Sequence, residues 1–190
     1  SKIWVNSPVL KVEKTTDKPF YKYGDIITYR IVLTQEQTGC VARNVTLQDV
    51  IDTQGVRLLK DSVILMDEKG NVADADVQIN DDNTFLMSTG RTLVRDSRYS
   101  ICDNDKGGLF EQVMYNPLDC QEQKSMIVEY QAAVIDAALA GQKVHNTAVA
   151  DSSEKIPATG EAETEVHSPI LEIVKESDKK EYASGEKGYY

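Results

Sequence analysis

The chain has 190 residues, 41% hydrophobic and 27% charged, which is enough to bury one core but hardly two domains of ordinary size. Its 21 Lys and Arg against 31 Asp and Glu give a formal charge of -10, which repels phosphate backbones and anionic membranes and excludes nucleic acid and membrane contact. No run of roughly 20 apolar residues marks a membrane helix and the opening SKIWVNSP is no signal peptide, so we expect any secretion signal or anchor to lie outside this sequence.

Alternation of apolar and polar residues with a period of two dominates the chain and predicts short β-strands. In the first clear case Ile27, Tyr29, Ile31 and Leu33 share one face. The same pattern recurs at residues 45–50, 63–66, 77–79, 85–87, 126–134 and 144–150, with turn sequences rich in Gly, Asn and Asp between them. Residues 135–141, IDAALAG, fit a single helical turn. Many short strands joined by turns indicate an all-β sandwich or barrel.

The three cysteines, Cys40, Cys102 and Cys120, are too scattered for a disulfide scaffold or a paired zinc site. Cys102 and Cys120 flank one polar loop, where a disulfide and two reduced thiols both fit the sequence. Carboxylates gather at residues 67–76 and 103–105, but the calcium-binding EF-hand register is missing, so hairpin turns explain them better. His145 and His167 are isolated, and we expect no metal site, no cofactor and no enzyme.

An internal repeat organises the chain. Residues 8–29, PVLKVEKTTDKPFYKYGDIITY, match residues 169–190, PILEIVKESDKKEYASGEKGYY, at eight of 22 positions without a gap. We therefore expect residues 8–166 to form one domain, residues 167–190 to open the next tandem repeat, and residues 1–7 to be a linker or the end of a preceding repeat. The segment IPATGE at residues 156–161 looks like a sortase sorting signal but lacks the apolar segment and basic tail that follow one, so we predict an interstrand turn.

Three polar residues lie on apolar faces of predicted strands. These are Lys14 with Leu10 and Val12, Asp49 with Val45 and Leu47, and Asn146 with Val144 and Ala148. Burial lowers the pKa of a lysine and raises that of an aspartic acid. A neutral Lys14 could then attack the side-chain carbonyl of Asn146 with help from a protonated Asp49, expelling ammonia and leaving an amide cross-link. Alternatively, Lys14 and Asp49 snorkel or form an ordinary salt bridge, while Asn146 caps a strand end.

Three segments resemble a known family: LKVEKTTDKPFYKYGDIITYRIVLT, TGCVARNVTLQDVID and GQKVHNTAVA look like the bacterial surface-protein repeat called domain of unknown function eleven and the related fimbrial isopeptide-forming domains. The resemblance does not extend to residues 56–120, and the family's proline after the acid's strand is absent. It implies an immunoglobulin-like β-sandwich of the isopeptide-forming adhesin and pilin type. In such domains lysine, acid and asparagine correspond to Lys14, Asp49 and Asn146.

The resemblance implies an extracellular location at the cell surface. We expect a structural stalk module of an adhesin or fimbrial protein, with adjacent repeats of the same chain as its partners. The alternative is a ligand-binding adhesin domain that contacts a host or extracellular-matrix ligand through residues 90–120.

Overall fold

The computed structural model describes residues 7–38, 40–95, 122–168 and 183–187, together with Glu176 and Glu181. Three predictions lie outside these residues: the Cys102–Cys120 pair, most of the 90–120 loop, and most of the repeat at residues 169–190. The described residues form two large β-sheets, one small sheet and two short 3-10 helices. None of their helices is long and apolar enough to cross a membrane.

The first sheet has six strands in the order β1–β3–β13–β7–β8, with β6 also paired with β13. Their bounds are β1 Leu10–Thr16, β3 Ile26–Gln35, β6 Val56–Leu58, β7 Ile64–Met66, β8 Val72–Ala73 and β13 Ser125–Val134. The long antiparallel pair of β3 and β13 forms its centre. Strand β1 pairs with β3 alone and is therefore an edge strand.

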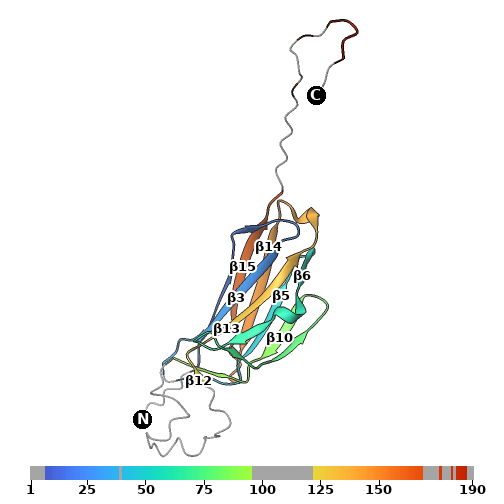
Figure 1. Ribbon diagram of the computed structural model, residues 1–190. Helices are drawn as coiled ribbons and strands as arrows, with labels where there is room; N and C mark the ends of the chain where they lie inside the picture. Colours follow the sequence, from blue (N-terminus) through green and yellow to red (C-terminus); the bar gives the residue numbers. More distant parts are fainter. Residues whose placement is uncertain are drawn as a thin grey trace, which may run out of the picture.

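The second sheet also has six strands, in the order β2–β15–β14–β5–β10–β9. Their bounds are β2 Phe20–Tyr21, β5 Thr46–Ile51, β9 Asp76–Ile79, β10 Thr84–Ser88, β14 Lys143–Asp151 and β15 Ala158–Val166. A small third sheet joins β4 Val41–Ala42, β11 Thr92–Val94 and β12 Glu122–Gln123, and the 3-10 helices are η1 Lys60–Ser62 and η6 Ala137–Leu139. Figure 1 shows β3 and β13 in front of β5, β14 and β15, as two layers of a sandwich.

The core lies between the two large sheets. Strand β3 alternates buried and more exposed residues, with Tyr29, Ile31 and Leu33 fully buried, and Leu47 and Phe85 of the second sheet belong to the same apolar cluster. Each large apolar side chain buried in this way stabilises the fold by about 2 kcal/mol. The prediction of an all-β sandwich is therefore confirmed.

The predicted strands are present with their ends shifted by one or two residues, and the predicted helical turn is η6, where Asp136 accepts a hydrogen bond from the Ala138 N–H at 2.8 Å. The carboxylate-rich segment after residue 66 is a hairpin turn as expected, because Asp67 accepts hydrogen bonds from the N–H groups of Lys69 and Asn71. The predicted turn at residues 156–161 is wrong from residue 158 onward, where β15 begins. Its small inward residues, Ala158 and Gly160, weaken the apolar alternation that reveals a strand.

Strands β1 and β15 lie side by side although they belong to different sheets and share no ladder of hydrogen bonds. Gly160 of β15 faces Val12 of β1 so closely that an added Cβ would lie 2.6 Å from the Val12 carbonyl oxygen. Only glycine permits this approach. The contact holds the edge strand of the first sheet against the second sheet, two residues before Lys14.

Candidate functional site

The structure brings together the three residues that the sequence singled out. Lys14 extends from β1 of the first sheet, whereas Asp49 and Asn146 lie on β5 and β14, which are neighbours in the second. In that pairing Asp49 is opposite Ala148, so Asn146 is its diagonal neighbour on the inward face. All three are buried, as face alternation predicted. Lys14 thus bridges the sandwich from one sheet to the other.

The Lys14 ammonium donates hydrogen bonds to both partners. Its Nζ contacts Asp49 Oδ2 and lies 2.5 Å from Asn146 Oδ1. The side chains of Lys14 and Asp49 are fully buried, so Lys14 does not snorkel, and Asn146 lies within β14 rather than capping its end. The arrangement is a buried ion pair with a carboxamide in contact with the cation.

Tyr130 completes the group, and sequence reasoning missed it. Its hydroxyl donates to Asp49 Oδ1 at 2.7 Å and accepts from Asn146 Nδ2 at 2.5 Å. Tyr130 lies on β13 among the inward residues of that strand and is 1% exposed. The signal in the sequence is a hydroxyl on an apolar strand face, which is weaker than a charge there because tyrosine is common in protein cores.

Aromatic rings surround the ion pair. Tyr29 and Tyr130 stack at 5.1 Å between ring centroids, and Phe85 packs edge-on against Tyr130, also at 5.1 Å. The Lys14 nitrogen lies 5.3 Å from the ring centroid of Tyr29 and 5.7 Å from that of Tyr130, within the range of cation–π attraction. The rings exclude water from the site while partly stabilising the ammonium.

Burial shifts both ionisable partners toward their neutral forms. It lowers the pKa of Lys14 to about 8, although Asp49 opposes the shift, and it raises the pKa of Asp49 against the opposing effect of Lys14. Transfer of one proton from Lys14 to Asp49 removes both charges from the core. The product is a neutral amine in contact with a carboxamide and a carboxylic acid, which are the reactants of an acid-assisted amide exchange.

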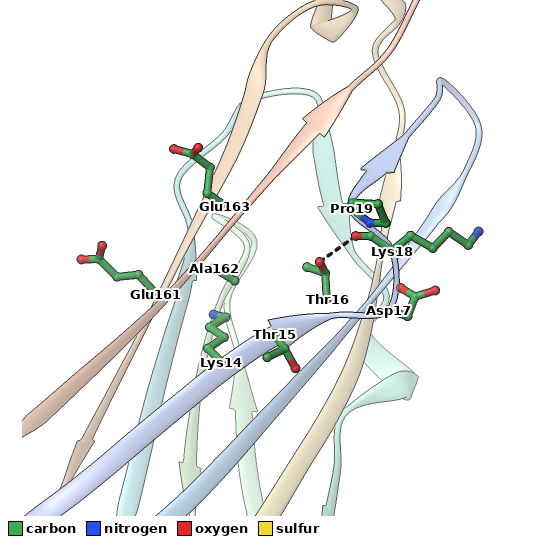
Figure 2. A pocket seen from close by; sticks show the side chains of 9 residues that line it. All are labelled: Lys14, Thr15, Thr16, Asp17, Lys18, Pro19, Glu161, Ala162 and Glu163. Carbon is green, nitrogen blue, oxygen red and sulfur yellow. Dashed lines mark hydrogen bonds between the residues drawn. The ribbon is translucent and has the colours of Figure 1, made fainter.

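A surface groove of about 450 Å³ opens between the end of β1 and β15 and reaches Lys14. Figure 2 shows Lys14 and Thr15 leaving β1 on opposite sides, with Lys14 directed toward β15 and Ala162. The Lys14 side chain itself stays covered. A second opening of about 310 Å³ is lined by Asn146 and shares Ala162 with the first. Both residues of the predicted cross-link therefore lie just beneath the surface.

The histidines, carboxylates and cysteine that the sequence offered as other candidates do not form a second site in the described part of the chain. No group of three or more His, Cys, Asp or Glu residues gathers there. His145 and His167 each contact one glutamate, Glu163 and Glu165, at 3.3 Å. Cys40 forms no disulfide with any described residue. Among the described residues, the group around Lys14 is the one that brings a buried amine, an acid and a carboxamide into contact.

No protein-family model and no curated protein matches the chain. The solved structures that it resembles include the major pilin subunit BcpA of Bacillus cereus, at 12% identity and a TM-score of 0.52, with 83% of this chain and 40% of that one covered. The N-terminal domain of the Streptococcus gordonii adhesin Sgo0707 is 14% identical with a TM-score of 0.52, and the match covers 84% of this chain and 32% of that one. The full-length major pilin SpaD from Corynebacterium diphtheriae is 15% identical with a TM-score of 0.50, and the match covers 82% of this chain and 34% of that one.

The chain spans two fifths or less of these three structures. At such low identity the likeness establishes the fold, which is an immunoglobulin-like β-sandwich of the kind found in pilin and adhesin domains. The particular repeat family that the sequence resembles is not matched by a family model.

Proposed function

We propose that the chain is a load-bearing stalk module of a pilus or adhesin at a cell surface, locked by an amide bond that it forms between Lys14 and Asn146. One observation carries this proposal: inside the core, the Lys14 nitrogen hydrogen-bonds both the acid Asp49 and the carboxamide of Asn146. The module spans residues 8–166. Residues 167–190 open the next tandem repeat and residues 1–7 are a linker or the end of a preceding repeat, so adjacent repeats are its partners.

The reaction follows from the neutral form of the pair. Lys14 passes a proton to Asp49, and the free amine attacks Cγ of Asn146. The Nζ–Cγ bond forms, the Cγ–Nδ2 bond breaks, and the amide nitrogen leaves as ammonia after gaining a proton. Each chain reacts once, so the module is not an enzyme in the sense of turnover.

The fold supports a structural role on a surface. Two of the similar structures are major pilin subunits and one is a domain of an adhesin. The internal repeat between residues 8–29 and 169–190 fits a tandem stalk. Ligand binding through residues 90–120 stays a prediction, because only residues 90–95 of that stretch are described.

The proposal is tested by the intact mass of the purified chain, with a peptide map that searches for a branched peptide joining Lys14 to Asn146. We expect the wild type to lack the mass of one ammonia and Asp49→Ala to keep its full mass. Asp81→Ala is the matched control, because that carboxylate has a side chain 98% exposed. It should cross-link like the wild type. A folded wild type whose mass shows no loss of ammonia would refute the cross-link.

A further inference from the structure

The hydroxyl of Tyr130 lies between the acid and the leaving group of the proposed reaction. It donates to Asp49 Oδ1 and accepts from Asn146 Nδ2, the nitrogen that departs as ammonia. The other carboxylate oxygen, Oδ2, contacts Lys14. Both oxygens of Asp49 are therefore engaged, and the Tyr130 hydroxyl hydrogen-bonds both the acid and the leaving nitrogen.

We infer that Tyr130 is a catalytic residue whose hydroxyl relays a proton from the Asp49 carboxyl to the leaving nitrogen of Asn146. The inference rests on the proposed function, since it concerns the same cross-link. Lys14, Asp49, Asn146 and Tyr130 are each at most 7% exposed, so bulk water has little access to replace this proton donor.

The proton transfer depends on a change in Nδ2 during the reaction. In the intact carboxamide the nitrogen lone pair is delocalised, so Nδ2 can only donate, as it does to Tyr130. Once Nζ has bonded to Cγ, that carbon is tetrahedral and the lone pair is localised on Nδ2. The nitrogen becomes basic, and the Tyr130 hydroxyl, already at hydrogen-bond distance, gives it a proton.

The atoms and charges balance over the sequence. Asp49 first takes a proton from the Lys14 ammonium at Oδ2, and a half-turn of the neutral carboxyl about Cβ–Cγ presents that proton to Tyr130. Tyr130 gives its own proton to Nδ2 and takes the carboxyl's. Cleavage of the Cγ–Nδ2 bond of Asn146 releases ammonia, and an electron pair on Asn146 Oδ1 reforms the carbonyl. Nζ then loses its extra proton to Asp49, which ends as a neutral acid.

Tyr29 provides a matched control for Tyr130. Its ring is fully buried, stacks on Tyr130 and lies at a similar distance from the Lys14 nitrogen. Its hydroxyl lies near the Asn146 carboxamide but, unlike that of Tyr130, meets the distance and angle of a hydrogen bond with none of the described residues. Tyr29→Phe and Tyr130→Phe therefore each remove one buried oxygen from the same aromatic pair, but only the second removes the proton path.

The experiment follows the appearance of the bond in newly made chains. Wild type, Tyr29→Phe and Tyr130→Phe are pulsed in cell-free translation, quenched in acid at intervals and weighed intact. We expect Tyr130→Phe to lose ammonia about a hundredfold more slowly than the wild type, as for loss of a general acid, and Tyr29→Phe, which keeps the aromatic ring, to be slowed by less than about tenfold. Circular dichroism checks that each variant folds.

The outcomes separate the two proposals. Absence of ammonia loss from the wild type refutes the cross-link itself, whereas a wild-type rate in folded Tyr130→Phe overturns only the role of Tyr130. If Tyr130→Phe does not fold, a fluorinated tyrosine at position 130 keeps the ring and hydroxyl but makes the hydroxyl more acidic. We then expect faster bond formation than with the same substitution at position 29, and equal rates overturn the inference.

Discussion

At the scale of single residues, the site places an ion pair where charges are costly. Burying Lys14 and Asp49 removes both from water, and their mutual attraction only partly offsets that loss. Hydrogen bonds from Tyr130 and to Asn146, together with the two aromatic rings, supply further compensation. Formation of the amide bond would remove the charges altogether, so the folded chain gains by reacting.

The pKa of Lys14 predicts how a chain without the bond responds to pH. In Asn146→Ala the amine stays free, with a folded pKa of about 8 against 10.5 for an ordinary lysine. The unfolded state then binds more protons between these values, so stability rises with pH, by about 2 kcal/mol from pH 8 to pH 10. Urea unfolding at several pH values measures it.

The double variant Lys14→Met/Asn146→Ala is the control for this pH dependence, because it lacks the titrating amine. Its stability should not rise with pH over the same range, and neither should that of the cross-linked wild type, in which Nζ is an amide nitrogen. The buried acid that remains, Asp49, has a raised pKa and can only destabilise the fold as the pH increases. A flat profile for Asn146→Ala would contradict the lowered pKa.

Three of the four site residues could be predicted because each breaks an apolar pattern. Lys14, Asp49 and Asn146 are conspicuous on faces that otherwise hold Leu, Val and Ala. Tyr130 is not conspicuous, because tyrosine is a common core residue whose hydroxyl acquires meaning only through its partners. Those partners lie far away in sequence, on β5 and β14, and the packing of the two sheets decides which residues meet.

At the scale of elements, the site depends on β1, which is bonded to its own sheet along only one edge. The other edge meets β15 through close packing, most tightly where Gly160 touches Val12. Because Lys14 follows on the same face of β1 as Val12, this contact sets how far the lysine reaches toward Asn146.

Gly160→Ala should therefore destabilise the fold. The added Cβ would lie 2.6 Å from both the side chain and the carbonyl oxygen of Val12, so β1 must shift, at a cost of about 1 to 3 kcal/mol. Thr159→Ala, at the exposed position next to it, should change stability by less than about 0.5 kcal/mol. Denaturant unfolding in the Asn146→Ala background compares them.

A second substitution identifies the cause. Val12→Ala removes the side-chain clash but leaves the backbone oxygen in place, so it should not restore the stability of Gly160→Ala. Full rescue would show that the backbone contact is unimportant. The same variants should also cross-link more slowly when Asn146 is present.

Most long strands were predictable, and the strands of two residues were not. Strands β3, β13 and β14 have nine or ten residues, enough for alternation to be read from the sequence. Strands β4, β8 and β12 have two residues each, and their pairing depends on contacts that tertiary packing supplies. Within residues 56–94, β6, β8 and β11 were therefore not predicted, whereas the strands expected at residues 63–66, 77–79 and 85–87 are present as β7, β9 and β10.

At the scale of the whole molecule, the proposed cross-link would lie between the two ends of the module. The described chain enters β1 at one pole and leaves β15 at the opposite pole (Figure 1). Lys14 and Asn146 are 132 positions apart, so most of the sandwich lies in the loop that the bond closes. By analogy with disulfides, closing a loop of this length stabilises the fold by about 4 to 5 kcal/mol.

Tension applied to the two ends gives the sharpest test of a stalk role. With the proposed bond in place, the load would pass from β1 through the amide bond to β14, so the residues between Lys14 and Asn146 could not extend. In Asn146→Ala they can, and 132 positions at about 3.4 Å each add about 450 Å of chain. Single-molecule stretching of the module between folded handle domains should show this added length in Asn146→Ala, and neither in the wild type nor in Asp81→Ala. If the wild type and Asp81→Ala extend as far as Asn146→Ala, no covalent bond carries the load, and the strength of the module comes from the strand contacts alone.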